Sequence, residues 1–450
     1  MLAGLVSPER STVTNLICAA GRRHEDWTAD YRLYAKGRVE PAALFDAVRE
    51  RLTGALAPGD PLVVAIDDTL VRKCGRHVDG VRWRRDPLGP AFQTNFVRGQ
   101  RFVQLSGLWP LGDGSAPAIP LAFEHAPGAG KAARDAGADE LARHREDQKQ
   151  KCLNAVALAQ MKILRGKCDP ARRLVFVGDG SYTNGVVLKG LPEGTAYIGR
   201  ARRDLALHHP PEAPAGPAGK GRPKRYGAPA PTPEALRVDD AVPWGKIGAY
   251  AAGARHEFRV KTLGPVQWRK SGADTTVRVV VIAPLGYRLR KGGKLLYRQP
   301  AYLVCTDPDM PVADILQRYL HRWGIEVNFR DEKTLAGTGE AQVRSRASNA
   351  TLPAVTVAAY AMLRVAAISM LGGGGLRNPL KPSRWRRPAE GDTGLPPTGE
   401  LIRLLRFETL GTSLRPDIIA RFANAPDPVA KSEKTPPGRI DLAATLFAAA

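Results

Sequence analysis

Three acidic residues stand where they could do metal-assisted chemistry. The run "PLVVAIDDT" carries Asp67 and Asp68 directly after its apolar residues, and "RLVFVGDGS" carries Asp179 in the same position. An apolar run that stops on an aspartate predicts a buried strand whose acidic end lies at a sheet edge, where α/β proteins place their sites. Glu326, in "YLHRWGIEVNFRDEK", is the third acid.

The segment around Glu326 has the pattern of an amphipathic helix. At about 100° per residue, Tyr319, Arg322, Glu326 and Lys333 share an arc of about 60°. A hydrophobic stripe beside it contains Leu316, Leu320, Trp323 and Val327. This places Glu326 on the shoulder of a buried face, although a helix with a solvated charged edge has the same pattern.

These three acids are expected to meet around a divalent cation. Converging carboxylates repel one another unless a cation neutralises them. Mg²⁺ fits best, because it prefers oxygen ligands and bridges to phosphates, and Mn²⁺ is expected to substitute for it. Two such ions activate a water or a 3′-hydroxyl for in-line displacement at phosphorus. Arg322 and Lys333 would then hold neighbouring phosphates, and Tyr319 would offer its hydroxyl to another.

The composition agrees with a nucleic-acid partner. The 450 residues carry a formal net charge of +23, which favours a polyanion, with a membrane surface or simple solubility as the alternatives. Five scattered cysteines without a C-x-x-C pair give no zinc or disulfide pattern and fit a reducing compartment. Without a visible export signal, a cytoplasmic protein is expected. Residues 352–371 are nearly long enough to span a bilayer, but Arg364 and Pro353 favour a buried core helix over a membrane span.

The chain divides into five predicted segments. Residues 1–58 form a helical N-terminal domain, a candidate for binding DNA ends or a plain packing domain, with Ser7 as an N-cap and Pro41 opening a helix. Residues 59–203 and 300–371 form two parts of an α/β core. Residues 204–299 hold a linker and a β-rich insertion, and residues 372–450 a flexible tail with a short helix.

The linker is rich in proline, glycine and alanine and contains "GKGRPKRYG". Its Gly-Arg-Pro core is flanked by Lys220, Arg222, Lys224 and Arg225, and resembles an AT-hook that lies in the minor groove. A solvated flexible tether is the alternative explanation.

The spacing Tyr319-x2-Arg322-x3-Glu326-x6-Lys333 resembles the Tyr-Arg-Glu-Lys signature of bacterial insertion-sequence transposases in the DDE superfamily. "AIDDT" and "VFVGDGSYTN" look like the two aspartate strands of that family. The resemblance covers roughly residues 60–370. It implies an RNase H-like mixed sheet flanked by helices and interrupted by a β-rich insertion.

By this resemblance Asp67, Asp179 and Glu326 are the catalytic and metal-binding residues. Asp68 competes for the first place, since only one of two adjacent strand residues can point into the site. Asp67 is favoured, because it follows the apolar run directly and Thr69 stands two positions on. Some transposases of this group stack a flipped base on a tryptophan, for which Trp268 and Trp244 are candidates, although a core tryptophan is the commoner case.

The resemblance implies a cut-and-paste transposase that acts on double-stranded DNA in the bacterial cytoplasm, associated with the nucleoid and without a membrane. A homodimer on DNA is expected, because pairing two element ends requires two protomers. The alternatives are an RNase H-like nuclease that never joins strands and a catalytically silent DNA-binding descendant.

Overall fold

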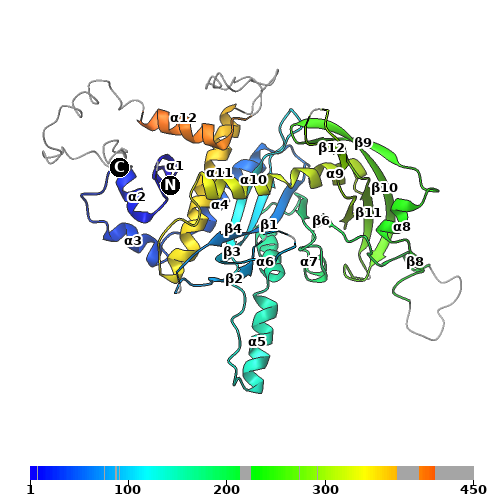
Figure 1. Cartoon of the computed structure of the whole chain (residues 1–450), viewed down its shortest axis with the longest axis horizontal. Helices are drawn as coiled ribbons and strands as arrows, with labels where there is room; N and C mark the ends of the chain where they lie inside the picture. The colour runs from blue at the N-terminus through cyan, green and yellow to red at the C-terminus, as the bar shows by residue number, and fades with distance from the viewer. Residues whose placement is uncertain are drawn as a thin grey trace.

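A computed structural model of the chain describes residues 1–7, 9–75, 77–86, 89–90, 92–212, 224–272, 274–290, 292–371 and 395–410. Among these residues the main feature is a 12-stranded mixed sheet with helices on both faces (Figure 1). The RNase H-like mixed α/β fold predicted from the sequence is confirmed.

The strands follow the predicted apolar runs closely. Along the sheet the order is β2-β3-β1-β5-β6-β14-β11-β10-β7-β8, with β4 paired to β3 and β9 to β10. The strands are β1 (Leu62–Arg72), β2 (Arg82–Arg85), β3 (Phe96–Leu108), β4 (Ala118–His125), β5 (Leu174–Gly178), β6 (Thr195–Arg200), β7 (Leu207–His208), β8 (Pro229–Ala230), β9 (Gly245–Ala251), β10 (Ala254–Trp268), β11 (Thr276–Ile282) and β14 (Ala301–Cys305). A separate two-stranded sheet contains β12 (Gly286–Arg288) and β13 (Leu295–Tyr297).

The helices pack on this sheet from both sides. They are α1 (Leu2–Val6), α2 (Val13–Ala19), α3 (Thr28–Ala35), α4 (Pro41–Ala55), α5 (Ala138–Gln150), α6 (Leu153–Gly166), α7 (Gly185–Lys189), α8 (Pro233–Val238), α9 (Val312–His321), α10 (Gly324–Thr334), α11 (Arg346–Leu371) and α12 (Thr398–Leu410). Helix α5 projects from the body, as Figure 1 shows.

Alternation along β1 decides which helices meet which face. Val64 and Ile66 belong to a core cluster that includes residues of α6, while Ala65 packs with Ile325 and Phe329 of α10. β1 runs antiparallel to β3 and parallel to β5. The two strands that carry the aspartates are therefore direct neighbours at the centre of the sheet.

The predicted boundary around the β-rich block does not separate two sheets. β6 pairs with β14, β14 with β11, and β11 with β10, so β7 to β11 extend the same sheet that holds β1 and β5, and only β12 and β13 of this block form a sheet of their own. The two short strands that flank residues 213–223, β7 and β8, also pair with each other at the end of this sheet. The described strands on either side of residues 213–223 therefore lie side by side at one edge of the sheet.

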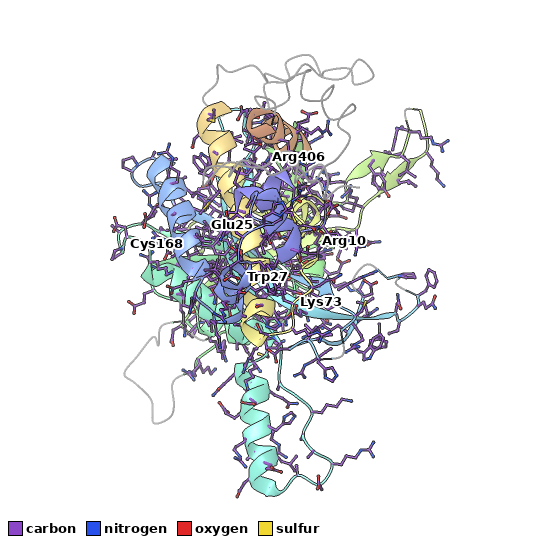
Figure 2. The ribbon with its side chains drawn as sticks, turned by 90° about the vertical axis from the view of Figure 1, so that its left-hand side faces the viewer. Arg10, Glu25, Trp27, Lys73, Cys168 and Arg406 are labelled. Carbon is purple, nitrogen blue, oxygen red and sulfur yellow. The ribbon has the colours of Figure 1, made fainter. Side chains whose placement is uncertain are left out.

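The N-terminal helices and the last described helix pack together. Arg406 of α12 donates hydrogen bonds to the carbonyl oxygens of Val6 (3.1 Å) and Ser7 (2.7 Å). The same side of the molecule faces the viewer in Figure 2, where Arg406 lies above the N-terminal helices.

The predicted N-cap at Ser7 is wrong: Ser7 follows α1 as its C-cap, and Thr12 caps the next helix by accepting a hydrogen bond from the Asn15 amide (3.2 Å). Leu5 packs against Ala336 and Tyr360, and this contact draws the first residues into a short helix of their own.

The short helix expected in the tail is present as α12, and it is docked on the body. The Thr398 hydroxyl donates to a buried Asp331 oxygen of α10 at 2.6 Å. The predicted flexible segments at 372–394 and 411–450 lie outside the described residues.

Helix α11 is long and apolar enough to cross a membrane by length and composition, but 61% of its apolar window is buried in the protein, as expected of a core helix.

Candidate active site

Asp67 lies near the middle of β1 and points to the face covered by α10. It is one residue beyond Ile66, which pairs with Gly178, the last residue of β5. Asp179 follows Gly178 directly, so parallel pairing brings the two aspartates to adjacent positions on neighbouring strands. On its other side Asp67 pairs with Gln104 of β3.

Asp68 points to the opposite face and has its own partners there. Its oxygens accept a hydrogen bond from Arg101 Nε (2.5 Å) and another from the Tyr182 hydroxyl (3.0 Å). Tyr182 is fully buried, and its pKa is raised by burial and by the charges of both aspartates. These contacts tie Asp68 to the neighbouring strand β3 and to the turn after β5, which favours Asp67 over Asp68 as the first carboxylate of the site.

Asp179 is held in a tight turn at the end of β5. Its Oδ1 accepts the Ser181 amide at 2.8 Å, and its carbonyl oxygen accepts the Thr183 hydroxyl at 2.8 Å. The next helix begins just beyond, where the Asn184 side chain accepts the amides of Val186 and Val187. The local hydrogen bonds of this turn hold the Asp179 backbone in place at the sheet edge.

Glu326 does not lie on one continuous helix with Tyr319. Helix α9 ends at His321, Arg322 and Trp323 form a turn, and α10 begins at Gly324. Gly324 packs closely on Ala118: a Cβ added there would lie 3.0 Å from the Ala118 Cβ. The break also turns Trp323 outward, so this side chain is 62% exposed and does not belong to the predicted hydrophobic stripe.

Arg322 ties the strand carboxylate to the helix carboxylate. Its Nη1 donates to Asp67 Oδ2 at 2.9 Å, and its Nη2 donates to Glu326 Oε1 at 3.0 Å. The arginine is itself buried, with 9% of its surface exposed. Among the described residues its Nε has no hydrogen-bond partner. The guanidinium fork therefore brings Asp67 and Glu326 together across 259 residues of chain.

The electrostatics of the site are those of crowded carboxylates. The pKa of Asp67 is raised to about 7, chiefly by burial; the charge of Arg322 opposes this rise and the charge of Asp179 adds to it. For Arg322, burial lowers the pKa, but the charges of Asp67, Tyr319 and Glu326 outweigh burial and leave it raised. The Asp67 carboxylate is thus short of positive charge even with an arginine beside it.

The donor set fits a hard divalent cation in its chemistry. Asp67, Asp179 and Glu326 offer only oxygen ligands, and a bound cation would favour the ionised form of Asp67 that burial disfavours. The arrangement is different from a preformed cage: in the described part of the chain, no group of three His, Cys, Asp or Glu side chains is gathered closely enough to hold a metal ion. The physical reason is Arg322, whose guanidinium lies between two of the three acids.

The other two members of the predicted stripe lie apart from each other. Tyr319 is half-buried near the acids: the Arg322 guanidinium lies 5.8 Å from its ring centre, and burial raises its pKa. Lys333 lies at the far end of α10, where burial lowers its pKa and its charged neighbours are Glu332, Arg72 and Asp68. The single arc expected for an unbroken helix is therefore wrong, and contact of either residue with phosphate stays a prediction.

A buried polar layer beneath α10 was missed in the sequence. Glu332 is completely buried and accepts a hydrogen bond from Gln104 Nε2 at 2.9 Å. Asn328, one turn earlier, donates to the Ala118 carbonyl (3.1 Å) and accepts the Tyr360 hydroxyl (2.9 Å). Burial raises the pKa of Glu332 to about 8. The sequence did contain a signal for this layer, namely the polar residues, Gln104 among them, at alternate positions of the apolar strand β3.

Stacking of Trp268 on a flipped base stays a prediction, and the structure places this indole in the core. Trp268 is 6% exposed and belongs to the main core cluster, where β10 brings it against its neighbours. Trp244 is half-buried between two cations, with Arg259 at 5.2 Å and Lys261 at 4.7 Å from its ring centre. Both indoles have structural roles here.

The predicted basic hook is only partly described. Lys224 and Arg225 are exposed where the chain enters β8, whereas Lys220 and Arg222 lie outside the described residues. Their contact with DNA stays a prediction.

Comparison with known proteins identifies a family. The model of the family described as "DDE superfamily endonuclease" matches residues 1–275, which is more than half of the chain. Asp67 and Asp179 lie inside the matched residues, and Glu326 lies beyond them. No curated protein matches the sequence.

Proposed function

We propose, from the premise that the chain belongs to the DDE superfamily of endonucleases, that it is a transposase that performs cut-and-paste DNA transposition. Membership of this family implies a DNA substrate and dependence on a divalent metal ion. The finer proposal is that the protein cuts the inverted ends of its own insertion sequence and joins them to target DNA. The Tyr-Arg-Glu-Lys spacing supports assignment to that subgroup.

The observation that carries the proposal is the Arg322 fork between Asp67 and Glu326. It links an acid on the central strand to an acid on the helix, next to the neighbouring strand that ends in Asp179. We assign all three carboxylates as the ligands of Mg²⁺, or of Mn²⁺ in its place, in a two-ion arrangement. When bound, the ions would activate the attacking oxygen and stabilise the leaving oxygen.

The residues of the chain itself position the substrate. Arg322 is suited to a phosphate because its fork matches two oxygens, and it would exchange its carboxylate contacts for phosphate contacts when DNA binds. Tyr319, over which the Arg322 guanidinium lies, would donate its hydroxyl to a neighbouring phosphate. Lys333 would contact the backbone farther along α10.

In both reactions one P–O bond forms for each P–O bond that breaks, so no external energy source is needed. In hydrolysis a water oxygen bonds to phosphorus while the P–O3′ bond breaks, which leaves a 3′-hydroxyl. In joining, that hydroxyl attacks a target phosphodiester, so one P–O bond forms as another breaks and the target strand keeps a free 3′-hydroxyl.

The partners follow from the reaction. The net charge of +23 suits double-stranded DNA, and synapsis of two ends would require a homodimer on DNA. A cytoplasmic, nucleoid-associated location follows from that substrate, and a membrane has no part in the reaction.

The decisive variant is Glu326→Gln, which keeps size and hydrogen bonding but removes the charge. It should reduce cleavage of a duplex carrying the element end by about a thousand-fold or more, while DNA affinity stays within about three-fold of the unmodified protein. Glu146→Gln, on the exposed helix α5, is the matched control and should leave both unchanged. Equal cleavage by Glu326→Gln would remove Glu326 from the chemistry.

The rival function is a nuclease without strand transfer, which the family description favours by its word endonuclease. A pre-cut end with a free 3′-hydroxyl, mixed with plasmid and Mg²⁺, separates the two. Covalent joints support transposition, and cutting without joints supports the nuclease. DNA binding without either reaction would identify a silent descendant.

A further inference from the structure

A two-stranded ribbon at one edge of the sheet combines exposed aromatic rings with arginines. It consists of β2 and the first residues of β3, paired antiparallel as Arg82 with Gly99 and Arg85 with Phe96. Figure 2 shows this light-blue ribbon reaching out from the body beyond the labelled Lys73. We call residues 82–85 and 96–99 the arginine ribbon.

One face of the arginine ribbon alternates rings and cations. Side chains alternate along a strand, and directly paired residues project to the same side. Because Trp83 pairs with Arg98 and Arg85 with Phe96, these four residues share one face in a checkerboard. Trp83 is 67% exposed and Phe96 57% exposed, and the Arg98 guanidinium lies 5.9 Å from the Trp83 ring centre.

The opposite face is anchored to the body. Arg84 Nη2 donates to the Pro127 carbonyl at 3.0 Å, and Arg82 donates to the carbonyl oxygens of Gly128 (3.3 Å) and Ala129. Arg72, at the end of β1, forms an ion pair with Asp86 at 2.9 Å. The exposed checkerboard is therefore presented on a fixed support.

The checkerboard lies on the same face of the sheet as Asp67. Gln104 pairs with Asp67, and the β1–β3 register runs without a shift down to Gly99. Phe96 and Arg98 are an even number of residues from Gln104, so all three project to one side. Eight residues separate Phe96 from Gln104, which is about 27 Å at ~3.4 Å per residue. That length corresponds to about eight base pairs of B-form DNA.

We propose that the arginine ribbon is a second DNA contact, which holds duplex about six to eight base pairs from the phosphodiester at the carboxylates. The inference deepens the proposed function and rests on it for the position of the cut. The chemistry selects the partner: arginine forks bind phosphate, and exposed rings contact sugars and bases, so charge and aromatic character together fit nucleic acid.

The test measures binding of a fluorescently labelled 30-base-pair duplex by anisotropy at several salt concentrations, without metal. Replacing both cations (Arg85→Ala with Arg98→Ala) should lower affinity about ten-fold and reduce the slope of log affinity against log salt by about two. Replacing both rings (Trp83→Ser with Phe96→Ser) should also weaken binding about ten-fold but leave that slope unchanged.

A charge-matched control checks that the effect is local. Arg143→Ala with Arg145→Ala removes two exposed arginines from α5. This double variant should change neither the DNA affinity nor the slope of log affinity against log salt. Trp83, Arg85 and Phe96 are exposed, and Arg98 is half-buried with one hydrogen bond to the Cys74 carbonyl (3.2 Å), so the thermal midpoint of each variant should stay close to that of the unmodified protein. A ribbon variant that binds DNA with unchanged affinity and slope overturns the proposal, and loss of self-association in that variant would assign the ribbon to a second copy.

Position is tested with a photo-crosslinking phenylalanine analogue in place of Phe96, and in place of Leu141 on α5 as the control. Only the first should crosslink to the duplex. On a duplex that the protein cuts, the adduct should lie about eight base pairs from the cut, and an adduct next to the cut would overturn the assigned spacing. Binding and crosslinking need no cleavage, so they remain interpretable if the proposed catalytic function fails.

Discussion

The two faces of β1 place adjacent aspartates in contrasting surroundings. On one face Asp68 has an arginine and a tyrosine hydroxyl as partners, both on neighbouring elements of the core. On the other face Asp67 shares one arginine with Glu326 and lies within the field of Asp179. Both aspartates form ion pairs, so an ion pair does not by itself distinguish structure from chemistry.

The difference lies in the balance of charge. Around Asp68 a single carboxylate meets Arg101 and a neutral hydroxyl donor, and the charges are matched. Around Asp67, one buried guanidinium is shared between Asp67 and Glu326 while the charge of Asp179 lies nearby, and the pKa of Asp67 is raised to about 7, chiefly by burial. A site short of one or two positive charges is prepared to receive a cation or to give up its arginine to a phosphate.

The largest expected effect separates the two aspartates directly. Asp67→Asn should reduce DNA cleavage by about a thousand-fold or more with little loss of stability, because the ionised form is already disfavoured by burial. Asp68→Asn should lower the free energy of unfolding by about 1–3 kcal/mol, since it weakens the partner of Arg101 and Tyr182. Cleavage assays and urea unfolding of both variants measure this, and the reverse pattern would exchange their roles.

The next effect concerns the arginine that stands between the acids. Arg322→Gln should bind Mn²⁺ about ten-fold more tightly than the unmodified protein in the absence of DNA, because the competing cation has gone. Arg101→Gln, on the other face, is the matched control and should leave Mn²⁺ affinity unchanged. Calorimetric titration of Mn²⁺ provides the measurement, and equal affinities in all three proteins would show that Arg322 does not compete with a metal.

A third effect, on stability alone, lies in the layer beneath the glutamate helix. The folded pKa of Glu332 is raised to about 8 by burial, so between its unfolded value and pH 8 the native state binds more protons than the unfolded chain. Its contribution to stability is present at low pH and is lost as pH rises through about 8. Glu332→Gln removes this loss, so its stability relative to the unmodified protein should rise by up to about 1.4 kcal/mol per pH unit.

Urea unfolding at pH 5, 7 and 9 measures the Glu332 effect. The exposed Glu146→Gln variant should follow the unmodified protein across this range. If the free energy of unfolding changed with pH in the same way for Glu332→Gln and for the unmodified protein, the Glu332 carboxyl would be ionised throughout this pH range.

The strands at the centre of this sheet could be predicted from the sequence, because a short apolar run is the sequence pattern of a buried strand. The run that stops on Asp179 became β5, whereas the strand expected to end at Asp67 continues to Arg72, so Asp67 lies in the middle of β1. The side of the sheet was also predictable, since period-two alternation sends Asp67 and Asp68 to opposite faces. An apolar run does not show which other strand it will pair with. The pairing of β6 with β14 and of β14 with β11 was therefore found only in the structure.

The helix that carries Glu326 shows the other limit. Counting residues around an ideal helix assumed that α9 and α10 were one element, but Gly324 packs against Ala118 and the chain turns at Arg322. The close approach of those two residues is a tertiary contact with no local signature. The exposure of Trp323 was misjudged for the same reason, because the exposure of an indole depends on which surface the rest of the fold presents.

The pairing of β6 with β14 has a consequence for engineering the protein. The whole excursion from residue 201 to residue 300 starts and finishes on adjoining strands, with Arg200 opposite Leu303. Its two ends thus lie on neighbouring strands, which are spaced roughly 5 Å apart, and the Ala201 amide donates to the Tyr302 carbonyl at 2.8 Å. A foreign module inserted into this excursion would have to leave in place β11, which pairs with β14, and Tyr250 of β9, which exchanges hydrogen bonds with Gln317 of α9.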